Sequence, residues 1–482
     1  MEKGRFMAGV TPLYNALKAY REHQPLRLHM PGHGGMGLPG CLEWQAPAAF
    51  DVTEIPGLDD LHQPQGVIAQ AQEMLARAVG AEISLMLVNG ASSGIHSLLL
   101  ALGDKAKVMI PRNAHRSFYG GLVISGAWPV YIPCRQDEEL GLALTVTAQA
   151  VQEIWENNPE VDALFITSPS YYGTCADIES LAAIAAGREK PLMVDEAHGA
   201  HFPFHPDYPG TALDSGAAAS VYGLHKTWPV FTQGACLNLS PGFSRHAALR
   251  TAHDLLTTTS PSYPLMASID LARSYMETYG GEHLERARLL ADEYKPRVNS
   301  IPGLKCPQGE WLQMPGVTGL DPLKALVSVS GLSLTGYQLD ALLRREYQIQ
   351  VEMAAENYIL AMFSLWHEQE DWQHFYHALE EIARRYQSDN RYRVSPVVPP
   401  AGELVMSPRQ AFFAAKRSLP LAECRNRVAG EMVAAYPPGI PCLVPGETIS
   451  EEVWEYLLYL QETGAHIQGP ERPDLARLVI IE

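Results

Sequence analysis

The chain has 482 residues, enough for about three domains and for a large buried core without disulfide or metal cross-links. Its 54 acidic residues outnumber its 36 lysines and arginines, and the resulting net charge of −18 argues against nucleic acid or an anionic membrane as the main partner. Seven cysteines without a CxxC pair predict neither a zinc site nor a disulfide framework. Residues 1–20 lack the apolar core of a signal peptide, and no stretch resembles a membrane span, so we expect a cytoplasmic protein.

The first predicted elements are an irregular stretch and a helix. Residues 22–66 are rich in proline and glycine. The helix that follows carries four apolar residues at helical spacing, Ile68, Ala71, Leu75 and Val79. Gly80 can end this helix.

Residues 32–37, GHGGMG, match the glycine pattern of a dinucleotide-binding turn, and Asp59 lies about 20 residues further on. Such a turn must follow a strand and open a helix. Pro31 and Pro39 flank the segment and prevent this arrangement, so we do not predict dinucleotide binding.

Between residues 80 and 240, short apolar runs alternate with helix-like segments such as Ser92–Leu102 and Glu179–Ala186. This alternation is typical of βαβ units and predicts an α/β fold with a mostly parallel, seven-stranded sheet. The seven runs are Ser84–Val88, Lys107–Ile110, Val130–Pro133, Ala163–Thr167, Leu192–Val194, Ser220–Tyr222 and Ala235–Leu239.

The remaining chain is predicted to form helices over residues 244–300, a second α/β unit to about residue 388, and a third unit over the last 80 residues. The second unit ends in a helix with apolar and aromatic residues at helical spacing between 372 and 386. The proline-rich segment 388–402 is typical of a linker. A last helix is expected at Glu451–Glu462.

Two residues that could bind a ligand or take part in catalysis follow predicted strands. Asp195 stands at the carboxyl end of one apolar run, where open parallel sheets bind their ligands. Lys226 follows another run, among aromatic and apolar residues. Burial there would lower the pKa of the lysine and make its amine nucleophilic.

A phosphate site is predicted at residues 88–102, VNGASSGIHSLLLAL. A turn at Asn89 and Gly90 precedes a helix opened by Ser92 and Ser93. Free N–H groups at a helix start attract phosphate, although serine is also an ordinary capping residue there. A phosphate cradle, a strand-end carboxylate and a buried lysine are what pyridoxal phosphate requires. His115, after the Lys107–Ile110 run, could stack on the ring of that cofactor.

With these residues in view, the sequence resembles the Orn/Lys/Arg decarboxylase family of fold-type-I pyridoxal-phosphate enzymes, in a short form without the N-terminal wing domain. The resemblance covers nearly the whole chain. The motifs that carry it are LHMPGHGG, DVTEIPGLDDLHQPQG, VNGASSG, PRNAHRS, TSPSYYG, DEAHGAH, LHKTWPVFTQGA, TTTSPSYPLMASID, SPRQAFFAAK and YPPGIPCLVPGE.

The resemblance implies a role for each matching residue. Lys226 would bind the cofactor covalently, Asp195 would pair with its ring nitrogen, and His115 would stack on its ring. His198 would lie close behind Lys226. The phosphate would be held by Ser92, Ser93 and His225, helped by Thr259 or Ser260 of a partner subunit. Glu447 would lie near the distal cation of the substrate, also at a subunit interface.

The same resemblance implies a division of the chain into four regions. Residues 1–66 would form an N-terminal arm and interface segment, and residues 67–300 the cofactor-binding large domain. A small α/β domain would follow at 301–388. Residues 389–482 would form a C-terminal domain that contributes to the substrate site.

Two positions depart from the family pattern. Gly223 stands where the family has a serine that contacts phosphate, three residues before the lysine. Gly34 stands in PGHGG where the family has a lysine. The first departure is expected to weaken cofactor binding, and the second puts an N-terminal contact in doubt.

From this we expect decarboxylation of a basic amino acid, arginine before lysine or ornithine, to yield a polyamine precursor, in a homodimer or larger oligomer with shared active sites. Another pyridoxal-phosphate reaction at Cα and a non-catalytic homologue that binds or regulates a partner stay open. A metal site would need a group such as Asp195, Glu196, His198 and His201. Lys226 and the phosphate cradle favour pyridoxal phosphate over metal at that place.

Overall fold

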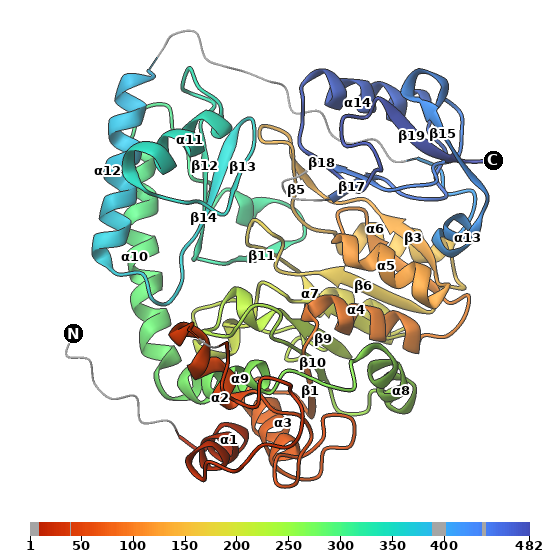
Figure 1. Ribbon diagram of the computed structural model, residues 1–482. Helices are drawn as coiled ribbons and strands as arrows, with labels where there is room; N and C mark the ends of the chain where they lie inside the picture. The colour runs from red at the N-terminus through yellow and green to blue at the C-terminus, as the bar shows by residue number, and fades with distance from the viewer. Residues whose placement is uncertain (1–8, 39, 388–401, 436–439) are drawn as a thin grey trace. The chain divides into compact units, whose positions relative to one another are not determined.

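The structure is a computed structural model (Figure 1). It describes residues 9–38, 40–387, 402–435 and 440–482. The expected linker at 388–402, apart from Gly402, lies outside the described residues, as does the YPPG part of the YPPGIP motif. No helix in the described part of the chain is long and apolar enough to cross a bilayer.

The chain forms two compact units, and each consists of two stretches of sequence. The first unit contains Met1–Ala101 and Met193–Leu284. The second contains Leu102–Leu192 and Glu285–Glu482.

The central sheet has seven strands in the order β1-β10-β9-β8-β6-β2-β3. β2 pairs in parallel with β3 and β6, and β8 with β9, whereas β10 runs antiparallel to β9 and β1. The predicted α/β fold with a mostly parallel sheet is therefore confirmed. Nearly every residue of six of these strands is buried, as apolar runs in a doubly covered sheet should be, whereas the edge strand β3 is half-buried at three of its five residues. The strands are β1 Ile83–Leu87, β2 Lys107–Pro111, β3 Trp128–Ile132, β6 Ala163–Thr167, β8 Leu192–Asp195, β9 Ala219–Tyr222 and β10 Ala235–Leu239.

In the first unit, helices pack closely on the sheet. α4 (Gly90–Ala101) follows β1, and a Cβ atom added at Gly94 would lie 2.8 Å from the Leu87 side chain. A glycine is therefore needed for this helix to approach β1. The other helices of this unit include α1 Pro12–Glu22, α2 Gln45–Phe50, α3 Val67–Ala78, α8 His246–Leu256 and α9 Tyr263–Tyr275.

Asp59 explains how α3 begins. Its backbone adopts the left-handed conformation, with φ +67°. Its carboxylate accepts five N–H groups, which include those of Gln65, Gly66 and Ile68 at 2.8–3.0 Å. Burial would raise the pKa of Asp59, but these N–H groups together hold it below its usual value. Asp59, which lies where a dinucleotide-binding protein would have its acidic residue, thus caps the start of α3.

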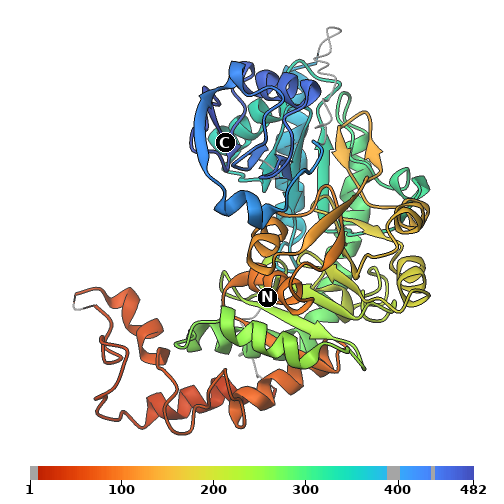
Figure 2. The same ribbon diagram turned by 90° about the vertical axis from the view of Figure 1, so that its right-hand side faces the viewer.

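The N-terminal arm, here residues 23–38 and 40–50, is the red to orange segment of Figure 2. It exposes many large apolar side chains. Six of its large side chains are 62–87% exposed: Leu26, Leu28, Met30, Met36, Leu38 and Trp44. Beside them lies a groove of about 420 Å³, lined in part by His33, Asp51 and Pro264. Gly34 in this arm has φ +56°, a conformation that favours glycine over the family's lysine.

The second unit adds a three-stranded sheet and a C-terminal segment to the strands β2, β3 and β6. Helices α11 and α12 pack with the strands of the small sheet around a core that includes Trp372, Leu379 and Ile382. A separate core forms around α14, which spans the predicted Glu451–Glu462. The helices and strands of this unit, besides β2, β3, β6 and α14, are α5 Arg116–Ser125, β4 Gln136–Asp137, β5 Leu142–Ala143, α6 Ala148–Asn157, β7 Thr174–Ala176, α7 Ile178–Ala186, α10 Gly281–Asn299, β11 Val317–Leu320, β12 Lys324–Ser328, α11 Gly336–Tyr347, β13 Met353–Ala354, β14 Tyr358–Met362, α12 Gln369–Arg385, α13 Pro408–Phe413, β15 Lys416–Pro420, β16 Val433–Ala435, β17 Ile440–Leu443, β18 Ile467–Gln468 and β19 Arg477–Ile481.

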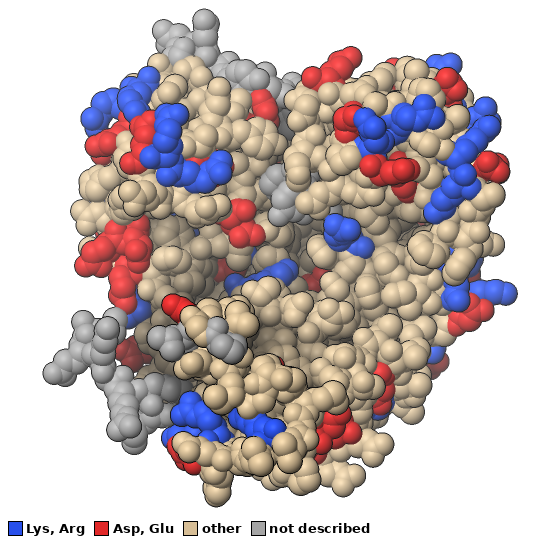
Figure 3. Space-filling view, in the orientation of Figure 1, with Lys and Arg blue, Asp and Glu red and all other residues tan. Residues whose placement is uncertain are grey.

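Charged side chains on the face shown in Figure 3 are mixed in sign. Over α11 and α12, Arg345 and Arg385 both pair with Glu346, at 2.7 and 2.8 Å. The basic residues of these helices therefore do not form a patch of concentrated positive charge.

Candidate active site

Lys226 and Asp195 lie at the same edge of the sheet. Asp195 is the last residue of β8, and Lys226 lies in the short helix Leu224–Lys226 that follows β9. β8 and β9 are parallel and adjacent, with Asp195 opposite Val221. Both side chains therefore emerge at the carboxyl ends of neighbouring strands, where α/β sheets bind ligands.

His198 completes this group in the first unit. Its Nε2 atom lies 3.0 Å from Nζ of Lys226, and the imidazole is buried. It follows β8 in the DEAHGAH segment, so the strand end that presents Asp195 also presents His198. A lysine held against an imidazole has a fixed direction, which suits a covalent partner for an aldehyde.

The carboxyl group of Asp195 is buried. Only 4% of its surface is exposed, and Oδ1 accepts the Ala197 N–H at 3.1 Å. Burial raises the pKa of Asp195, while the positive charge of Lys226 opposes that shift. A protonated ring nitrogen would supply the cationic partner that a buried carboxylate needs.

Two adjacent carbonyl groups bring the predicted phosphate ligands together. The Gly90 N–H at the start of α4 donates to Gln233 O, and the His225 N–H donates to Gly234 O. The first turn of α4, with Ser92 and Ser93, therefore lies near His225. His225 Nδ1 is 3.0 Å from Gly234 O, and burial lowers the pKa of this ring.

Within that cradle the two serines differ. The Ser93 hydroxyl donates to Gly90 O at 2.9 Å, so its hydrogen is already used inside the helix. The Ser92 side chain is half-buried. The start of a helix, with its N–H groups and dipole, would favour a dianion here. The residues present thus fit pyridoxal phosphate, with a covalent lysine, a carboxylate and an anion site.

The structure gives a reason for the glycine at position 223. A Cβ atom at this position would lie 2.9 Å from Ala197 O and 3.2 Å from Cδ of Lys226. A serine would therefore displace the backbone beside His198 or the stem of the lysine. The close approach of the two strand ends accounts for the departure from the family pattern.

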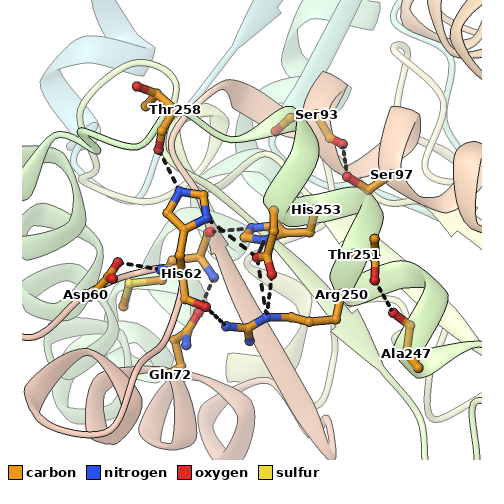
Figure 4. Close-up of polar contacts among 12 residues, drawn as sticks. Asp60, His62, Gln72, Ser93, Ser97, Ala247, Arg250, Thr251, His253 and Thr258 are labelled. Carbon is orange, nitrogen blue, oxygen red and sulfur yellow. Dashed lines mark hydrogen bonds and ion pairs between the residues drawn. The ribbon is translucent and has the colours of Figure 1, made fainter.

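The loop that carries Thr259 and Ser260 is tied to the N-terminal part of the first unit by His62 (Figure 4). His62 Nε2 lies 2.9 Å from Thr258 O, and the His62 carbonyl accepts from Arg250 at 2.7 Å. Thr259 and Ser260 are exposed, and the predicted reach of these residues to a partner subunit stays a prediction. His62 was not singled out from the sequence, because nothing in DLHQPQG indicates a contact 196 residues away.

His115 and Glu447 belong to the second unit. His115 caps α5, and its Nδ1 accepts the Ser117 N–H at 3.2 Å, so the neutral ring carries its proton on Nε2. Glu447 is fully buried and forms two hydrogen bonds with Arg112, at 2.6 and 3.0 Å. Burial raises the pKa of Glu447, and the charge of Arg112 opposes this. The predicted contact of Glu447 with a substrate cation stays untested, and its carboxylate is already paired.

Glu196, next to Asp195, is a further buried carboxyl group. It is 2% exposed, and its Oε1 atom accepts the Ala212 N–H at 2.9 Å. Burial raises the pKa of Glu196 to about 8, and the Ala212 N–H only partly offsets this. The side chain therefore keeps its proton in the folded protein near neutral pH.

Because Glu196 keeps its proton on folding, we expect the effect of Glu196→Gln on the free energy of unfolding to depend on pH. Between pH 4.5 and about 8 the folded protein holds a proton that the unfolded chain releases, so the stabilisation falls as the pH rises. Gln cannot ionise, so the free energy of unfolding of the variant should gain on that of the wild type by up to roughly 5 kcal/mol as the pH rises through that range. Urea denaturation at several pH values measures this. The exposed Glu82→Gln is the control, and a difference that does not change with pH would contradict the burial argument.

The sequence and the structure were compared with those of known proteins. Residues 11–371 match the model of the Orn/Lys/Arg decarboxylase major domain, and residues 394–472 match that of the C-terminal domain. The arginine decarboxylase of Bacillus subtilis (strain 168) is 36% identical over 479 residues, which cover 98% of each chain. Lysine decarboxylase LdcA of Pseudomonas aeruginosa is 24% identical and aligns with 95% of this chain and 76% of its own. The solved structure of Francisella novicida lysine decarboxylase LdcF has a TM-score of 0.83 at 20% identity, and the match covers 98% of this chain and 81% of that one.

Proposed function

The chain belongs to the Orn/Lys/Arg decarboxylase family of pyridoxal-phosphate-dependent carboxy-lyases, and we propose that it converts arginine to agmatine and so feeds polyamine synthesis. The observation that carries this proposal is the group formed by Lys226, His198 and Asp195 at one sheet edge, with Nζ 3.0 Å from the imidazole. Arginine is favoured because the B. subtilis arginine decarboxylase matches this chain more fully in identity and length than LdcA does.

When bound, pyridoxal phosphate supplies an electron sink for the carbanion that remains as CO₂ leaves. Lys226 would hold it covalently, and the carboxylate of Asp195 would keep a proton on its ring nitrogen. The phosphate would lie at the start of α4, held by Ser92, Ser93 and His225, and by Thr259 or Ser260 of a partner subunit.

The protein must also place the substrate and return a proton. His115 would lie on the face of the ring and keep it flat. A dry site around the substrate carboxylate favours its departure as neutral CO₂, since a buried charge is then lost. Lys226 and His198, already in contact, are the groups that would deliver a proton to Cα.

We propose further that the active protein is a homodimer or larger homo-oligomer. The exposed apolar side chains of the N-terminal arm support this, because isolated soluble proteins rarely expose so many together. Thr259 and Ser260 are exposed and would complete the phosphate site of a second copy. A cytoplasmic location agrees with the seven cysteines, none of which forms a disulfide in the part of the chain that the structure describes.

CO₂ release from each of the twenty amino acids tests the function. The purified protein with pyridoxal phosphate should act on arginine with a kcat/KM at least about tenfold above that for lysine or ornithine, as about 1.4 kcal/mol of selective binding gives. Release mainly from lysine or ornithine would change the substrate. Turnover of a basic amino acid without CO₂ would indicate another reaction at Cα. Cofactor binding without turnover of any amino acid would favour a binding or regulatory homologue.

A further inference from the structure

Arg112 and Glu447 form a buried ion pair that the sequence did not reveal. Two nitrogen atoms of Arg112 contact both oxygens of Glu447, at 2.6 and 3.0 Å. The side chain of Glu447 is 0% exposed and that of Arg112 is 17% exposed. Such two-pronged geometry between planar groups is the strongest form of a protein ion pair.

The pair is built into the surrounding structure on both sides. Arg112 also donates to Cys442 O at 3.1 Å, and its guanidinium lies 4.8 Å from the centre of the Tyr131 ring. Glu447 also accepts the Val444 N–H at 3.0 Å. Glu447 thus accepts three hydrogen bonds from this chain's own groups, one at Oε1 and two at Oε2.

Arg112 is the first residue of the loop that leads to His115. Its N–H donates to Ile132 O, and the Ala114 N–H donates to Pro111 O, so the loop leaves β2 in a tight turn. Asn113 accepts from the Cys134 thiol at 3.0 Å. The loop ends at His115, the cap of α5. Arg112 with Glu447 links this loop to the C-terminal segment through full charges.

We propose that Glu447 is a positioning residue: it fixes Arg112, and through it the 112–115 loop that ends at His115. The inference rests on the proposed function only for the role of His115 toward the cofactor. It replaces the expected contact between Glu447 and the substrate with an indirect role.

The test compares Glu447→Gln with Arg112→Gln. Both variants should lower kcat by about tenfold or more and leave KM for arginine within about threefold, because a misplaced positioning group affects the reacting geometry more than binding. Both should also weaken the visible circular dichroism of bound pyridoxal phosphate. Glu451→Gln, in the exposed pair with Arg425 at 2.9 Å, is the matched control and should change neither.

Each other outcome has a defined meaning. A large rise in KM for Glu447→Gln but not for Arg112→Gln would overturn the proposal in favour of direct substrate contact. So would circular dichroism and kinetics that match those of the control. If Glu447→Gln or Arg112→Gln does not fold, the same measurements are made on Arg112→Lys, which keeps the charge and loses only the two-pronged geometry. If the wild type binds the cofactor but releases no CO₂, the proposed function fails, while the dichroism still tests the ion pair.

Discussion

Replacement of Lys226 by alanine should abolish CO₂ release and remove the visible absorbance of the bound cofactor. Nζ of Lys226 would be the nucleophile at this sheet edge, where it lies 3.0 Å from Nε2 of His198. Loss of a residue that bonds covalently during catalysis lowers kcat on the order of 10⁴–10⁶-fold. Absorbance spectra of the purified protein with added pyridoxal phosphate, together with a CO₂ assay, measure both effects.

A matched control makes this result specific. Lys190→Ala removes a partly exposed lysine that pairs with Asp162 at 3.2 Å, and it should leave spectrum and activity unchanged. Lys226→Arg keeps a positive charge but cannot form the same bond, and it should be as inactive as Lys226→Ala. An unaltered spectrum in Lys226→Ala would show that the cofactor is bound through another group.

Most of the fold was predictable from the sequence because apolar runs report directly on buried strands. All seven predicted strands are present, with ends shifted by at most two residues. The order of the strands was not predictable. Strand order and direction depend on contacts far apart in the chain, and the antiparallel β10 is a short, buried apolar run like the parallel strands.

The site was predictable to the extent that its residues follow strands. Asp195 and Lys226 are each found by their place after an apolar run, and the sheet brings them to one edge. The ion pair of Arg112 and Glu447 joins positions 335 residues apart, and no local pattern relates them. The same holds for His62, whose contact with the 258–260 loop exists only in the folded chain.

Asp195→Asn should lower kcat on the order of 10²–10⁴-fold while the cofactor stays covalently bound, since the proposed role of the residue is that of a proton partner of the ring and not of its anchor. Lys226 is unchanged in this variant, so the visible absorbance should persist in altered form. The neighbouring Glu196→Gln is the control. Glu196 is already neutral near pH 7 because burial raises its pKa to about 8, and its replacement should have little effect on kcat.

Although Asp195→Asn should lower kcat, it should not lower the stability of the cofactor-free protein. Because burial raises the pKa of Asp195, its contribution to stability is lost as the pH rises through the raised value. Asn avoids that cost, so the cofactor-free variant should unfold at the same temperature as the wild type or higher at pH 8, and pyridoxal phosphate should stabilise it less. Thermal unfolding with and without the cofactor measures both. Equal stabilisation of the two proteins by pyridoxal phosphate would mean that Asp195 does not contact the ring nitrogen, whatever its effect on kcat.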